Sequence, residues 1–210
     1  IQNAKKLIES GKLGFIHRVV AFNCYFVDLI KESRSWKLNS KIEIGSIFDT
    51  EVHYIDDLRY LLGKEIIEVY GKVRKFKKEF ENAPADDVIA IIDFEEGSNG
   101  FLEISENQWR GNGNISNGEG INFHGNDGSL EISLSGKFNA YFKDGQEIKE
   151  NYTPDYNKIW KEFHHSFVKS ILEDSPIPVT GEEATKNLAV ILAILKLSEK
   201  NRPISLIEDK

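Results

Sequence analysis

The chain has 210 residues, of which 40% are hydrophobic and 29% charged, and its formal net charge is −7. This composition is typical of a folded globular protein and excludes a disordered one. The negative charge argues against nucleic acid and against anionic membrane surfaces, since both favour a basic protein face. No apolar run approaches the roughly 20 residues that cross a bilayer. We therefore expect neither nucleic acid nor a membrane as a partner.

Cysteine and methionine usage bear on the setting of the chain. Cys24 is the only cysteine, which excludes an internal disulfide and a metal site built of several cysteines. A reducing, cytoplasmic location suits it. The sequence begins with Ile1 and has no methionine, so we interpret it as a fragment cut from a longer protein. A second possibility is that modified methionines are missing from it, which would alter some spacings.

The first third of the chain predicts helix, strand, loop and helix. Residues 2–10 show helical apolar spacing and stop at Gly11. Residues 14–26 alternate and are rich in β-branched and aromatic side chains, which predicts a strand. Residues 31–45 are polar and irregular and are expected to form a loop. A helix is predicted over 46–62, ending at Gly63, and its buried stripe is expected to be Phe48, Val52, Ile55, Leu58 and Leu62.

A long β region follows. Its expected strands are 65–76, 86–94, 100–109, 120–125, 129–133 and 137–142. The short connections between several of them contain Gly with Asn or Asp, which tolerate positive φ in hairpin turns. Connections this short predict an antiparallel meander.

Two helices are predicted near the end of the chain. Thr153 is expected to cap the first, with Pro154 and Asp155 in its first turn, and Trp160, Phe163, Phe167, Val168 and Ile171 face one way. Thr180 and Glu183 fit a capping box for the second. Its expected buried stripe is Ala184, Leu188, Ile191, Leu192 and Leu195. The segment 204–206 can add a final strand.

Together these elements predict an α+β fold, a mostly antiparallel open sheet with helices packed on one face. The strand at 86–94 is hydrophobic on both faces, as an antiparallel strand needs only when both faces are covered. One interpretation is that a second copy of the chain covers the other face, giving a homo-oligomer, a dimer or tetramer. The alternative is a single, deeply buried central strand.

Asp49 and His53 are the candidate catalytic pair. They lie at i and i+4 on one helix face, where a carboxylate can fix an imidazole tautomer and support its charged form. Such a histidine could take a proton from a secondary alcohol as the carbon loses hydride. The simpler interpretation is structural: Ser46 and Asp49 fit a capping box, and Asp49 and His53 fit a surface ion pair.

Several segments resemble the C-terminal domain of the glucose–fructose oxidoreductase / inositol dehydrogenase (Gfo/Idh/MocA) superfamily. The run IGSIFDTEVHYIDDLRYLLG (44–63) is similar to its Asp-x-x-x-His helix. AKKLIESGKLGFIHRV (4–19), FHGNDGSLEI (123–132) and the end of the chain from 176 to 206 resemble its first helix and strand, its glycine hairpin and its closing helix and strand. The likeness covers nearly the whole chain.

The resemblance implies roles for individual residues. His53 would be the acid/base acting on the substrate hydroxyl, and Asp49 would orient it and contact substrate. Trp36 and Lys37 match a Trp-Arg pair that borders the nicotinamide in some members, with Lys as a departure. Ile44 replaces the first glycine of a Gly-Gly pair.

The family further implies NAD or NADP, bound mainly by an N-terminal Rossmann domain that these 210 residues do not contain. No G-x-G-x-x-G opens a helix after a strand here. We expect residues 1–210 to be the substrate-binding and dimerising C-terminal domain of a two-domain oxidoreductase, inactive on its own.

Three further residues are candidates for substrate binding. Arg34 and Arg110 are isolated in predicted loops, where a guanidinium could bind a hydroxyl-rich or anionic substrate, although solvated surface positions are the default. His164 lies in a predicted helix and could line the cleft. No metal is expected, because His164 and His165 with Asp49 and His53 match no ligand spacing.

The preferred function is NAD(P)-dependent oxidation or reduction of a sugar, polyol or related secondary alcohol or ketone. There are two alternatives. One is a non-catalytic dimerising or binding module of the same fold, and the other is a metal-dependent hydrolase using Asp49, His53 and either His164 or His165.

Overall fold

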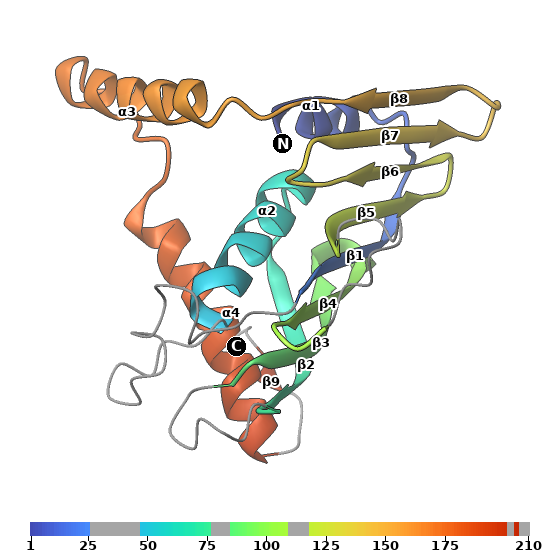
Figure 1. Ribbon diagram of the computed structural model, residues 1–210, viewed down its shortest axis with the longest axis vertical. Coiled ribbons are helices and arrows are strands. Elements are labelled where there is room, and N and C mark those ends of the chain that lie inside the picture. Colours follow the sequence, from blue (N-terminus) through green and yellow to red (C-terminus); the bar gives the residue numbers. More distant parts are fainter. Residues whose placement is uncertain (26–46, 77–84, 109–117, 201–203, 206–210) are drawn as a thin grey trace.

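The computed structural model describes residues 1–25, 47–76, 85–108, 118–200 and 204–205, and Figure 1 shows their arrangement. The helical elements are α1 (Gln2–Glu9), a π-helical turn η2 (Ile47–Glu51), α2 (Val52–Leu62), a 3₁₀ turn η3 (Glu95–Gly97), α3 (Tyr156–Leu172) and α4 (Gly181–Lys200). The strands are β1 (Ile16–Cys24), β2 (Ile66–Arg74), β3 (Asp87–Phe94), β4 (Asn99–Ser105), β5 (Glu119–Gly125), β6 (Gly128–Ile132), β7 (Lys137–Phe142), β8 (Glu147–Asn151) and β9 (Ile204–Ser205).

The described strands form one open sheet in the order β8-β7-β6-β5-β1-β4-β3-β2-β9. β1 and β4 run parallel, and the other neighbours are antiparallel. Tight turns make the meander possible. Gly136, between β6 and β7, has a φ of +104°, and a Cβ there would lie 1.7 Å from the Tyr152 carbonyl oxygen, so only glycine fits. The predicted α+β fold with a mostly antiparallel open sheet is confirmed.

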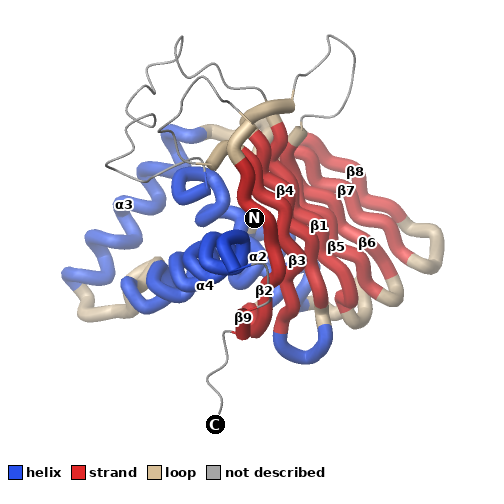
Figure 2. Tube along the Cα trace, turned by 90° about the horizontal axis from the view of Figure 1, so that it is seen from below, coloured by secondary structure: helices blue, strands red, loops and turns tan. Residues whose placement is uncertain are grey.

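Helices cover one face of the sheet at its β2 end (Figure 2). α4 packs on β2, α2 packs on α4, and α1 packs on α2. The inward side chains of β3, which are Val88, Ala90, Ile92 and Phe94, are buried, and each large one contributes roughly 1.5–3 kcal/mol by leaving water. Gly63 ends α2 in the left-handed conformation, with a φ of +65°, as the sequence predicts.

The opposite face of the same strands is apolar and uncovered in this chain. Ile89 and Ile91 alternate with the buried side chains of β3 and are 44% and 51% exposed, and Tyr70 of β2 is exposed as well. The strand is therefore hydrophobic on both sides, as its sequence indicates, and it is not the deeply buried strand of the alternative interpretation. A second copy on this face stays a prediction.

α3 departs from the predicted packing of the helices on the sheet. It extends away from the sheet (Figure 1), and Ser170 is its single buried residue. The expected apolar face of Trp160, Phe163, Phe167, Val168 and Ile171 is exposed. Its N-cap is Asp155, whose carboxylate accepts a hydrogen bond from the Lys158 N–H at 3.1 Å, and not Thr153. An aspartate side chain two residues nearer the helix competes well for this position.

The predicted buried stripe of α4 is confirmed at Ile191 but is wrong at most of its other positions. Ala184, Leu188 and Leu192 are exposed, and Leu195 is half-buried. The buried residues are Asn187, Val190, Ile191, Ala193, Ile194 and Leu197. Because the helix is apolar on most sides, periodicity offers more than one stripe, and contact with β2 selects among them. The Thr180 hydroxyl does accept the Glu183 N–H at 3.2 Å, as in the predicted cap.

One strand, β8, is absent from the sequence prediction; it is a polar edge strand, EIKEN. The short β9 pairs with β2 and confirms the final strand. Within the described ranges, no helix is both long and apolar enough to span a bilayer.

Candidate active site

The candidate pair lies at the beginning of the α2 segment. The predicted helix 46–62 starts with a π-helical turn, Ile47–Glu51, before it continues as α2. Asp49 belongs to the π turn and His53 to the first turn of α2, and both are exposed. Short π-helical stretches are rare and occur frequently at functional sites. Ser46, the partner in the predicted capping box, lies outside the described residues.

The two side chains are not joined in this structure. Among the described residues, no hydrogen bond or ion pair links Asp49 to His53, so neither the predicted surface ion pair nor the predicted orienting contact is present. Both groups are accessible to a ligand arriving from solvent. One carboxylate and one imidazole on a single accessible turn can take up a proton and stabilise the resulting charge.

Glu51 is a titratable residue of this turn that sequence reasoning missed. Its side chain is fully buried, at 0% exposure, while Asp49 and His53 are exposed. Among the described residues, neither carboxyl oxygen has a hydrogen-bond partner. Burial raises the pKa of Glu51 to about 8, because the charged form loses its hydration. Helical spacing could have found it, since Glu51 precedes Ile55 by four residues and Leu58 by seven, on the buried stripe.

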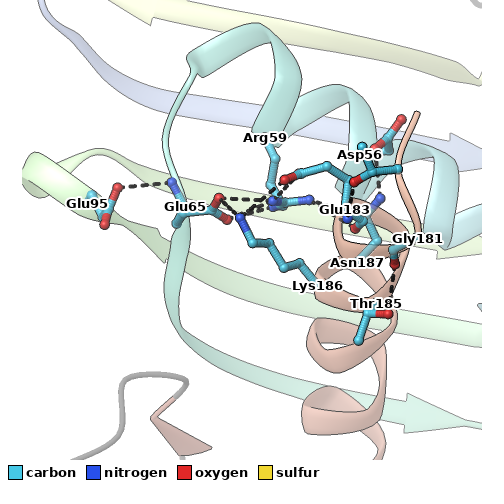
Figure 3. Close-up of polar contacts among 10 residues, drawn as sticks. Asp56, Arg59, Glu65, Glu95, Gly181, Glu183, Thr185, Lys186 and Asn187 are labelled. Atoms are coloured by element: carbon cyan, nitrogen blue, oxygen red, sulfur yellow. Dashed lines mark hydrogen bonds and ion pairs between the residues drawn. The ribbon is translucent and has the colours of Figure 1, made fainter. Parts of the chain in front are cut away.

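A polar network fixes α2 against α4 and against the residue that precedes β2 (Figure 3). The buried Arg59 donates to Glu65 through Nε at 2.9 Å and Nη2 at 3.0 Å. It also donates to Glu183 Oε2 and to Asn187 Oδ1, each at 2.6 Å. Asn187 in turn donates to Asp56 Oδ1 at 2.7 Å. Planar guanidinium suits such multiple contacts.

The network has electrostatic and positional consequences. The hydrogen bonds from Arg59 lower the pKa of Glu65 to about 2, since they favour the charged carboxylate. Because Arg59 and Asp56 both belong to α2, their bonds to α4 fix the rotation of the helix about its axis. The direction in which His53 points is set by the same rotation. The sequence shows Arg59 as an ordinary polar residue, and its partner Glu183 is 124 residues away.

Of the other predicted site residues, His164 is the one that the structure describes, and it lies on a different helix from this pair. Arg34, Trp36, Lys37 and Arg110 lie outside the described residues. His164 is on α3, which lies far from the η2 end of α2 (Figure 1). Its Nδ1 is 2.7 Å from the Trp160 carbonyl oxygen, and its ring contacts Trp160 and Phe163. The structure therefore gives His164 a place in an exposed aromatic cluster on α3.

Among the described residues, the candidate pair belongs neither to a metal-binding cluster nor to a surface hollow beside Lys12. Within the part of the chain that the structure describes, no group of three or more His, Cys, Asp or Glu side chains could hold a metal ion. An open hollow of about 530 Å³ is lined by Lys12, Asp127, Phe142, Lys143, Asp144 and Gln146. Of the predicted site residues that the structure describes, Asp49, His53 and His164, none lines it. The metal-dependent hydrolase therefore has no support in the described residues.

Comparisons with known proteins address the fold and family. Residues 5–206 match the family model described as the C-terminal alpha/beta domain of an oxidoreductase family, GFO_IDH_MocA_C. A comparison with curated proteins found no match.

Solved structures show the same fold. An aldose-aldose oxidoreductase from Caulobacter crescentus complexed with glycerol is 20% identical, with a TM-score of 0.81, over 97% of this chain and 59% of that one. Levoglucosan dehydrogenase in complex with NADH is 20% identical, with a TM-score of 0.81, over 98% and 62%. An Agrobacterium radiobacter oxidoreductase in complex with NAD+, L-tartaric acid and magnesium is 14% identical, with a TM-score of 0.79, over 97% and 60%. The chain thus spans about three fifths of each.

Proposed function

Because the chain belongs to the Gfo/Idh/MocA oxidoreductase family as its C-terminal α/β domain, we propose that it carries the acid/base residue of an NAD(P)-dependent oxidoreductase. The substrate is a sugar, polyol or related secondary alcohol or ketone. The observation that carries the proposal is the exposed pair of Asp49 and His53 on the turn that opens α2. The names of similar structures, an aldose-aldose oxidoreductase and a levoglucosan dehydrogenase, agree with this substrate class.

In this role His53 takes the hydroxyl proton as hydride leaves the carbinol carbon, and returns it in the reverse direction. Asp49 favours the protonated imidazole and contacts the substrate. The hydrogen bonds of Arg59 keep α2 in one orientation, so the imidazole of His53 is already oriented towards bound substrate. Among the described residues no hydrogen bond or ion pair joins Asp49 to His53, and catalytic hydrogen bonds are often long or poorly aligned in unliganded sites.

The nicotinamide cofactor is assigned to a further, N-terminal nucleotide-binding domain. The similar structures with NADH and NAD+ are longer than this chain, which spans 62% and 60% of them. The cofactor accepts or supplies the hydride. Trp36 and Lys37 would border its nicotinamide ring, and Arg34 and Arg110 would contact substrate hydroxyl groups. On this proposal residues 1–210 alone do not turn over substrate.

The experiment uses the longer, two-domain protein. His53→Ala should lower turnover by about 10²–10⁴-fold while NAD(P)H still binds, as measured by nicotinamide absorbance and by cofactor fluorescence. His124→Ala is the matched control, because His124 is also exposed but lies on β5. Unchanged turnover in His53→Ala, or an equal loss in His124→Ala, would refute the role of His53.

The uncovered face of the sheet supports a proposal about assembly. Tyr70, Ile89 and Ile91 form an exposed apolar surface on β2 and β3, and monomers rarely leave such surfaces uncovered. We assign it to a homo-oligomer, a dimer or tetramer, built face to face between two sheets. Ile91→Lys should produce monomers in sedimentation velocity, whereas Leu134→Lys, at an exposed turn position, should not. A monomeric wild-type protein would contradict the assignment.

A further inference from the structure

Glu51 occupies an unusual position for a carboxyl group. It closes the π-helical turn and is the N-cap residue of α2, two residues after Asp49 and two before His53. Its side chain points into the protein, where it is fully buried, while the side chains of Asp49 and His53 are exposed to solvent. The candidate acid/base pair and this buried acid are therefore parts of one turn. Any rotation that brings Glu51 out must also move Asp49 and His53.

The described surroundings of Glu51 do not stabilise a charged carboxylate. Both of its oxygens are buried and accept or donate no hydrogen bond within the described part of the chain. The described elements that pack against the turn are α2, α4 and β4. They carry charged groups such as Asp57, Lys186 and Glu103, but among the described residues none acts on the pKa of Glu51, which burial alone raises to about 8. The group is consequently neutral at pH 7.

Ionisation has a structural consequence at such a site. An isolated buried carboxylate costs several kcal/mol, and the group gains hydration only by leaving its position. The backbone at Glu51 is the junction between the π turn and α2, so a movement of this junction would carry the side chain towards solvent. A leucine at this position would fill a similar volume but could not ionise.

We propose that Glu51 is a positioning residue for the turn that carries Asp49 and His53: its protonated carboxyl group keeps the turn in place, and its ionisation releases the turn. The effect on turnover rests on the proposed function, whereas the movement of the turn does not. Ionisation of Glu51 under alkaline conditions lowers activity reversibly, and it does so independently of the charge of His53.

The direct test follows the backbone amide shifts of Asp49, Thr50 and Val52 by ¹⁵N NMR in residues 1–210 between pH 6 and pH 10. A common step with a midpoint near pH 8 is expected in wild type. Glu51→Gln, which is neutral and of equal size, should abolish it. His53→Gln should keep it, which separates Glu51 from the imidazole. A wild-type protein without the step, or a step that survives in Glu51→Gln, would overturn the proposal.

A second variant and an activity measurement complete the test. Glu51→Leu replaces Glu51→Gln if the amide variant does not fold, and it must also lack the step. In the two-domain protein, wild-type turnover at pH 9 should be about 10-fold lower than at pH 7, since roughly 90% of a group with a pKa of 8 is then ionised. Glu51→Gln should stay within about 2-fold. We expect His53→Gln to lose turnover while its amide step remains. If His53→Gln keeps its turnover, the role of His53 is rejected, but the proposal for Glu51 is not.

Discussion

α2 and α3 are both rich in apolar side chains, but only α2 is part of the core. α2 has 11 residues and buries Tyr54, Ile55, Leu58, Arg59 and Leu61. α3 has 17 residues and buries Ser170, and its Leu172 is 80% exposed. The difference lies in what each helix can reach: α2 contacts α1 and α4 and is fixed by the Arg59 network. Apolar periodicity shows that a helix has a face to cover, but not what covers it.

The largest effect is expected at the buried face of α2. Leu58 is 1% exposed, and Leu58→Ala removes its packing and leaves a cavity. The free energy of unfolding should fall by about 2–5 kcal/mol, measured by urea denaturation of residues 1–210. A loss below about 1 kcal/mol would mean that α2 is as loosely held as α3.

The next effect concerns pH and Glu51. Its folded pKa of about 8 lies above the value near 4.3 of an unfolded glutamate, so the unfolded state releases its proton first as pH rises. The contribution of Glu51 to stability should therefore be greatest below about pH 4.5, fall as pH rises towards 8, and then level off. The fall between pH 5 and pH 8 should be about 3 kcal/mol smaller in Glu51→Gln. If the unfolding free energies of the two proteins, measured by urea denaturation, change equally with pH, Glu51 is not a buried neutral acid in the folded protein.

Removal of the Arg59 network should follow in size. Arg59→Met keeps most of the side-chain volume but breaks the bonds to Glu65, Glu183 and Asn187, and should cost about 2–3 kcal/mol.

This variant also has a pH signature. The pKa of Glu65 is lowered to about 2 in the folded protein, so its contribution to stability is present above about pH 4.5 and disappears as pH falls towards 2. Arg59→Met should lack that part of the acid dependence in thermal unfolding. Lys158→Met, on exposed α3, is the control and should retain it.

The smallest effect is expected on α3. Phe167 is exposed, so Phe167→Ala should change the unfolding free energy of residues 1–210 by less than about 0.5 kcal/mol. The pair Leu58→Ala and Phe167→Ala, compared in the same denaturant, measures the contrast between the helices. A loss of several kcal/mol in Phe167→Ala would place α3 in the core.

Features set by local chemistry were predictable from the sequence. Glycine turns, alternation in β3 and the left-handed end of α2 at Gly63 follow from the conformational preferences of single residues and from short-range periodicity. The candidate pair is likewise visible as a spacing, and the family from the order of several segments. β8 escaped prediction because a polar edge strand is stabilised by pairing with β7 and not by its own composition.

Features set by contacts between distant segments were not predictable. The buried side of α4 depends on which of its apolar faces meets β2. The role of Arg59 depends on Glu183 and Asn187, more than 120 residues away. Helical spacing places Glu51 beside Ile55 and Leu58 of the predicted stripe, but the usual preference of carboxylates for water argues against burial there. In each case the tertiary environment overrides a local rule.

The most direct test of the central claim is the pH dependence of single-turnover nicotinamide reduction in the two-domain protein, with substrate and cofactor saturating. We expect the wild-type rate to show a limb that falls as the solution becomes more acidic, and His53→Ala to lose both this limb and about 10²–10⁴-fold of the rate. A His53→Ala protein with the wild-type limb and rate would show that the exposed imidazole at the start of α2 does not move the substrate proton.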